Sequence, residues 1–148
     1  MMKLFKFTVL AMFFSVIFVS SMAMNLVLHE GAHYAVADAL GMHPQIHFTP
    51  DNISSKNFFS MDTEIAYVQY SSATSDVTKD DALVALAGPL ADLSLGALGV
   101  GLFFKTKRTK VAKMLLIFLV IPALVSFAIN IFPTYPADGY YVFQYLLS

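Results

Sequence analysis

The sequence contains no cysteine and few charged residues. Without cysteine the chain has no disulfide framework, no thiolate metal site and no cysteine nucleophile, so any metal must be held by nitrogen and oxygen ligands. Charged residues make up only 13% of the 148 residues and hydrophobic residues 57%, whereas soluble domains are about a quarter charged. The mean hydropathy is +0.67. This composition predicts a membrane protein.

The sequence also lacks an excess of charge of either sign. Its formal net charge is −1, and a surface that binds nucleic acid needs clustered Lys and Arg to neutralise phosphates. We therefore expect no nucleic-acid partner. The chain shows no internal repeat, low-complexity tract or long linker, and its length favours one domain over residues 1–148.

Three apolar stretches are long enough to cross a bilayer, which takes about 20 residues. They cover residues 5–28, 82–104 and 114–132. The first helix is expected to continue to residue 40, because no helix breaker precedes Gly41, a residue suited to the left-handed position that ends helices. Residues 1–23 also resemble a cleaved signal peptide, but the apolar run continues past them. The predicted fold is an α-helical membrane protein with three or more transmembrane helices.

The polar loop over residues 41–81 separates the first span from the second. Its segments QIHFT (45–49) and EIAYVQY (64–70) are rich in β-branched and aromatic residues, which favour strands. We therefore predict a small extramembrane β-hairpin. Asp80 and Asp81 follow at the position where an N-cap and a first-turn acid favour the start of the second helix.

Basic residues are unevenly distributed among the loops. They flank the first span on its N-terminal side and fill the link between the second and third spans, whereas the loop over residues 41–81 carries more acidic than basic residues. Because Lys and Arg prefer the cytoplasmic side, we expect a cytoplasmic N-terminus and an outer location for the polar loop and the C-terminal segment. The basic residues are Lys3, Lys6, Lys105, Lys107, Arg108, Lys110 and Lys113.

The sequence HEGAH lies at the outer end of the first span. On a helix, the H-E-x-x-H spacing places His29 and His33 one turn apart on the same face, where both can bind one metal ion. Glu30 then lies beside the metal and can take a proton from water. Ionisable residues at a membrane span are costly and usually functional. The motif therefore predicts a zinc site.

A catalytic zinc site normally has a third protein ligand and one open position. The candidates for this ligand are Asp38, His43, His47, Asp92 and Asp138. Asp38 is five residues beyond His33 and points away from the histidine face, so we expect it to be solvated or interfacial. His43 and His47 lie in the loop beyond the first helix and remain open.

Asp138 stands in NIFPTYPADG, directly after the third span. The loop charges place the end of this span and HEGAH at the same membrane depth. Asn130 and Pro133 are among the residues that interrupt the helix here, and non-helical backbone at membrane depth is tolerated only where protein or a water cavity surrounds it. This segment is therefore a candidate part of the site.

Three segments together resemble the signatures of the site-2 protease family of intramembrane zinc metalloproteases (peptidase family M50). They are HEGAHYAVADALGM, AGPLAD and NIFPTYPADG, each on its own span. The resemblance covers most of the chain, although no PDZ or CBS domain is visible, and it implies a minimal protease core. It implies that His29, His33 and Asp138 bind Zn²⁺ and that Glu30 is the general base.

The same resemblance assigns roles to further residues. Asn130 and Pro133 match the family's N-x-x-P, which implies a part in substrate binding, and Gly88 and Pro89 match its G-P signature.

The chain also departs from the family pattern. Ala137 replaces the usual Leu before D-G, and Asp92 stands where Asn is common. Asp92 is interpreted as a partner of a ligating His, a protonated group hydrogen-bonded between helices, or a residue of a water cavity, with the cavity role preferred.

The expected function is that of a zinc-dependent endopeptidase acting on a membrane protein or peptide within the lipid bilayer. The principal alternative is a noncatalytic binding or chaperone module on the same scaffold. A small transporter that uses His and Asp as a metal pathway is a further alternative. The sequence assigns no oligomeric state.

Overall fold

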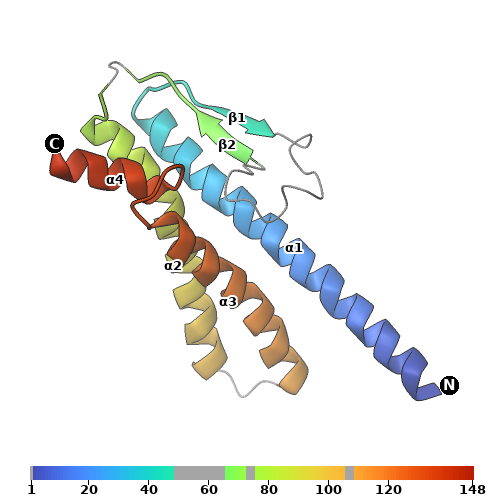
Figure 1. Ribbon diagram of the computed structural model, residues 1–148. Coiled ribbons are helices and arrows are strands. Elements are labelled where there is room, and N and C mark those ends of the chain that lie inside the picture. Colours follow the sequence, from blue (N-terminus) through green and yellow to red (C-terminus); the bar gives the residue numbers. More distant parts are fainter. Residues whose placement is uncertain (1, 49–65, 73–75, 106–108) are drawn as a thin grey trace.

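The computed structural model describes residues 2–48, 66–72, 76–105 and 109–148. The described part of the chain forms three long helices, a two-stranded hairpin that lies between the first and second of them in the sequence, and a short C-terminal helix (Figure 1). The helices are α1 (Met2–Ala39), α2 (Lys79–Lys105), α3 (Lys110–Asn130) and α4 (Asp138–Leu147), and the strands are β1 (Gln45–Phe48) and β2 (Ala66–Gln69).

Three helices are long and apolar enough to cross a membrane. Their spanning portions cover Phe7–Ala39, Lys79–Lys105 and Ala112–Asn130, with mean hydropathies of 2.1, 1.7 and 2.4. The chain is therefore an α-helical, multi-pass membrane protein, as its composition predicted. The continuation of the first helix beyond HEGAH to the region of Gly41 is also confirmed.

The C-terminal half of α1 lies against α2, and Phe14 and Phe18 nearer its N-terminus lie against Phe118 of α3. Only the N-terminal end of α1 extends away from the α2–α3 pair (Figure 1). Only 6% of the most apolar stretch of α1 is buried inside the protein, whereas 39% of the corresponding stretch of α2 is buried. α2 is therefore the central helix, and it contacts α1, α3 and α4.

The ends of α1 and α2 follow from local sequence. Gly41 adopts the left-handed φ of 72°, and its N–H donates to the carbonyl of Asp38 (2.9 Å), as expected of a glycine that ends a helix. At the start of α2, Thr78 and Asp81 form a reciprocal cap: the Thr78 N–H donates to Asp81 Oδ2 (2.8 Å) and the Asp81 N–H to Thr78 Oγ1 (3.2 Å). Asp81 thus takes the third position of a capping box, and Thr78 is the cap instead of Asp80.

Pro122 lies inside α3 and lacks the N–H that would bond to the carbonyl of Phe118. Ser21 of α1 donates its hydroxyl to this carbonyl over 2.8 Å. In lipid a freed carbonyl needs a partner from a neighbouring helix. This hydrogen bond therefore joins α1 to α3 at the proline.

The hairpin confirms the predicted pairing of the two loop segments. β1 and β2 are antiparallel, and Ile46 is opposite Val68. The predicted strand segments also include Thr49, Glu64 and Ile65, which lie outside the described residues.

α4 was not predicted, because the segment after the third span was interpreted only as a break in the helix. The chain turns sharply after α3 so that Gly139 packs against the backbone of Ile131. A Cβ at Gly139 would lie 2.5 Å from the Ile131 carbonyl carbon. Only glycine permits this approach, which places Asp138 at the first turn of α4.

Candidate metal centre

His29 and His33 face α2 from the C-terminal half of α1. Both are buried, with exposed fractions of 5% and 6%, and their Nε2 atoms are 3.1 Å apart. The one-turn spacing of the motif brings the two rings together as predicted. His33 contacts the carbonyl of Val84, which is five residues beyond Lys79, the first residue of α2. From the rise of an α-helix, the contact with His33 therefore lies roughly 7.5 Å along α2 from its N-terminal end.

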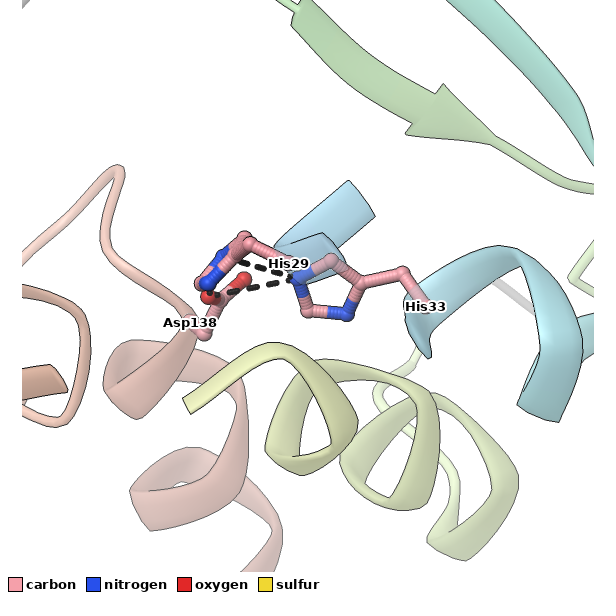
Figure 2. Close-up of side chains that lie close together, drawn as sticks. All are labelled: His29, His33 and Asp138. Carbon is pink, nitrogen blue, oxygen red and sulfur yellow. Dashed lines mark hydrogen bonds and ion pairs between the residues drawn. The ribbon is translucent and has the colours of Figure 1, made fainter. Parts of the chain in front are cut away.

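Asp138 reaches the same point from the first turn of α4. Its Oδ2 is 3.1 Å from His29 Nε2 and 3.4 Å from His33 Nε2, and Figure 2 shows the three side chains pointing toward one another. Among the described residues, these three form a group of potential metal ligands. Asp138 is therefore the third candidate ligand that the structure brings to the histidines.

The separations fit a tetrahedral metal ion. Nitrogen and oxygen ligands about 2.0–2.1 Å from such an ion lie roughly 3.3 Å from one another, and the three observed separations run from 3.1 to 3.4 Å. Two imidazoles and one carboxylate also form a donor set typical of catalytic zinc, with one position open.

Gly88 of α2 lies beside this group, and its lack of a side chain leaves room for the two histidine rings. A Cβ at Gly88 would lie 2.6 Å from His29 Nε2 and closer still to His33 Nε2. Any side chain here would press on the two nitrogens that face Asp138. The Gly of the predicted G-P signature therefore has a direct steric role.

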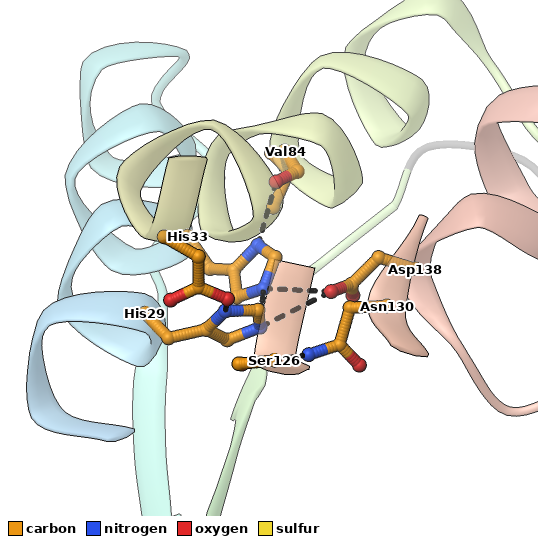
Figure 3. A network of polar contacts seen from close by, with 7 residues as sticks. His29, His33, Val84, Ser126, Asn130 and Asp138 are labelled. Atoms are coloured by element: carbon orange, nitrogen blue, oxygen red, sulfur yellow. Dashed lines mark hydrogen bonds and ion pairs between the residues drawn. The ribbon is translucent and has the colours of Figure 1, made fainter. Parts of the chain in front are cut away.

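The far nitrogen of each ring is held by an acceptor, and Figure 3 shows the one that holds His33. His29 Nδ1 is 2.8 Å from Asp92 Oδ2, and His33 Nδ1 is 2.6 Å from the Val84 carbonyl oxygen. A carbonyl only accepts hydrogen bonds, so His33 Nδ1 carries a hydrogen, and a carboxylate imposes the same tautomer on His29. In neutral rings both Nε2 lone pairs then converge on the Asp138 carboxylate, an arrangement that a bound cation satisfies.

Asp92 is only 1% exposed. Its carboxylate is enclosed between helices and bonded to His29, which favours the predicted role of a histidine partner over that of a water-cavity residue. The observed contact is the one expected of a residue that orients a metal ligand.

The Asp138 carboxyl is electrostatically tuned by the same neighbours. Burial alone would raise its pKa, but when the two rings are protonated their hydrogen bonds and positive charges outweigh burial and hold the pKa below its ordinary value. Asp138 is thus predisposed to be an anionic ligand.

The other predicted site residues are Glu30, Asn130 and Pro133. Glu30 is buried, with 9% exposed, and follows His29 on α1. The Asn130 amide donates to Ser126 Oγ over 3.3 Å, which leaves its carbonyl oxygen to accept from a peptide N–H. Pro133 is exposed in the turn after α3.

The alternative ligands are not part of the group. Asp38 is exposed, as predicted. His43 is exposed in the loop with φ 50°, and His47 stacks on Tyr67 with ring centroids 5.2 Å apart. Of the candidates for a third ligand, Asp138 is therefore the one whose carboxylate lies close to both histidines.

Sequence reasoning did not find Val84, because its contribution is a backbone carbonyl that every residue possesses. It also missed Tyr70 at the end of β2. Burial, followed by the negative charge of Asp81 and by Tyr141 and Asp138, raises the pKa of the Tyr70 phenol to about 12. Tyr70 thus connects the hairpin with the start of α2 near the candidate site.

Comparison with family models, curated proteins and solved structures finds no match to this chain.

Proposed function

We propose that this protein is a zinc-dependent intramembrane endopeptidase that resembles the site-2 protease family. It would cleave a membrane-embedded or juxtamembrane segment of a membrane protein or peptide. The observation that carries the proposal is the convergence of Asp138 with the two histidines of H-E-x-x-H, because His33 and Asp138 are 105 positions apart in the chain. Nothing in the local sequence requires that meeting.

The donor set supports chemistry rather than a purely structural metal, since three protein ligands leave one position open. Bound at His29, His33 and Asp138, zinc would supply Lewis acidity that polarises a carbonyl and makes water more acidic. Glu30, in the position of the motif's base, takes the proton of the attacking water and returns it to the leaving amine. Asp92 and Val84 keep the Nδ1 hydrogens in place during these transfers.

The surroundings of the site suit an extended peptide. The Asn130 carbonyl oxygen is a candidate acceptor for a substrate N–H, because its amide is engaged by Ser126. The two-stranded hairpin packs against α1, and a free strand edge can bind an unwound substrate segment by strand addition. A helical substrate must be unwound in this way before its carbonyl is accessible.

The charge pattern supports one orientation for this activity. Lys105 and Lys110 flank the link at the opposite end of α2 and α3 from the candidate site, and basic links face the cytoplasm. We therefore propose that the N-terminus is cytoplasmic and that the site lies toward the outer face.

The experiment compares the wild type with Glu30→Gln and Asp138→Ala after reconstitution in liposomes. We expect the wild type to hold about one zinc ion per chain and to cleave members of a panel of single-pass model peptides, with products identified by mass spectrometry. Glu30→Gln should keep the zinc and lose roughly 10²- to 10⁴-fold in rate, whereas Asp138→Ala should lose zinc affinity. Full zinc occupancy and activity in Asp138→Ala would contradict the assignment.

The same comparison separates the enzyme from a noncatalytic module. A binding or chaperone protein has no use for a general base. Glu30→Gln would therefore leave its function unchanged, and the wild type and the variant would give the same result in the cleavage assay.

A further inference from the structure

The two candidate histidine ligands are supported by chemically different acceptors. A carboxylate holds His29 at Nδ1 (2.8 Å), whereas a neutral backbone carbonyl holds His33 (2.6 Å). A carboxylate behind an imidazole increases the basicity of the ring as a ligand more than a neutral acceptor does. The two rings are therefore not equivalent.

Asp92 is a costly residue at its position in α2. It is 1% exposed, and its Oδ1 has no hydrogen-bond partner within the part of the chain that the structure describes. Burial of a charged group is unfavourable unless the group is paired. The contact with His29 is the interaction that compensates this cost, so the residue is tied to the candidate metal centre rather than to general helix packing.

The charges of the group point the same way. Asp92 and Asp138 lie at opposite nitrogens of His29, and with neutral imidazoles they contribute two negative charges. A divalent cation would offset both of these charges in an environment where an unbalanced charge is expensive. Asp92 would thus add countercharge at the candidate metal centre, beside Glu30, without contacting the ion.

We propose that Asp92 is a positioning residue that fixes the tautomer and orientation of His29 and thereby sets the divalent-metal affinity of the site. This inference rests on the proposed metal centre. Substitution of such a partner typically lowers metal affinity 10- to 100-fold. Asp92→Asn keeps an oxygen acceptor but removes the charge, and Asp92→Leu removes both, so the two variants separate charge from orientation.

Asp81 offers a matched control. It is a second buried acid on α2, 5% exposed, but its Oδ2 accepts from Thr78 and Ser72 and not from a histidine. Asp81→Asn therefore removes a buried charge from the same helix while leaving the support of His29 intact.

The test measures zinc dissociation constants by chelator competition and the visible spectrum of the Co²⁺-substituted protein for each purified variant. Melting of the metal-free proteins verifies that each variant is folded. We expect an affinity loss of about 10-fold for Asp92→Asn and about 100-fold for Asp92→Leu, an altered Co²⁺ spectrum in both, and wild-type behaviour for Asp81→Asn.

Wild-type affinity and spectrum in both Asp92 variants would overturn the positioning role, as would equal losses in Asp92→Asn and Asp81→Asn. His29→Ala distinguishes this failure from that of the proposed function. If His29→Ala keeps wild-type zinc affinity, the metal centre itself is wrong, whereas loss of zinc in His29→Ala beside unaffected Asp92 variants refutes only the role of Asp92.

Discussion

Replacement of Gly88 by alanine should disable the candidate metal centre without changing any ligand. The added Cβ would lie 2.6 Å from His29 Nε2 and closer to His33 Nε2. Ordinary contact distances are about 3.4 Å or more, so the rings must retreat by roughly 0.8 Å or more. They are anchored at Nδ1 by Asp92 and Val84, so retreat stretches those hydrogen bonds. Metal–ligand distances tolerate only about 0.2 Å.

Overpacking of this kind costs about 1–3 kcal/mol, which corresponds to a loss of roughly 5- to 150-fold in zinc affinity. Zinc competition titration of Gly88→Ala against the wild type measures this loss directly. Gly31→Ala is the control, because it lies within HEGAH but its Cβ would have nothing within 4 Å, and alanine favours the helix by about 1 kcal/mol. Wild-type zinc affinity in Gly88→Ala, or an equal loss in Gly31→Ala, would refute the steric reasoning.

Two further predictions concern the scaffold and the hairpin end. Ser21→Ala should destabilise the protein by about 0.6–1.7 kcal/mol, measured by unfolding in mixed micelles. The loss should be smaller in a Pro122→Ala background, because the restored N–H of residue 122 then bonds to the Phe118 carbonyl. Equal losses in both backgrounds would contradict the role of Ser21 as the replacement partner of that carbonyl. The raised pKa of Tyr70, about 12, favours the neutral phenol in the folded state, so its stabilising contribution is present below about pH 10 and is lost as pH rises toward 12. In an absorbance titration Tyr70→Phe should remove the ionisation near pH 12, and an unchanged titration curve would count against this environment.

The main structural features were accessible from local patterns. Long apolar runs predicted the three spans, Gly41 predicted the end of α1, and segments rich in β-branched and aromatic residues predicted the hairpin. Each of these signals lies within one segment, and each depends on the properties of that segment alone.

The sequence did not predict features that depend on how separate segments face one another. Asp92 was compatible with three roles because nothing in α2 indicates which side chain of α1 lies opposite. α4 was missed because the breakers before it obscured the short helix that follows. Its position depends on the close approach of Gly139 to Ile131.

The sequence by itself determined the membrane class of the protein and the pairing of His29 with His33, since hydrophobicity and the 3.6-residue period of a helix are one-dimensional properties. Only the tertiary structure decided that Asp138, instead of His43 or His47, joins them, and that Asp92 and Val84 hold their far nitrogens. Those contacts depend on the relative depth and rotation of separate helices, which are set by packing among α1, α2 and α4 and not by any single segment.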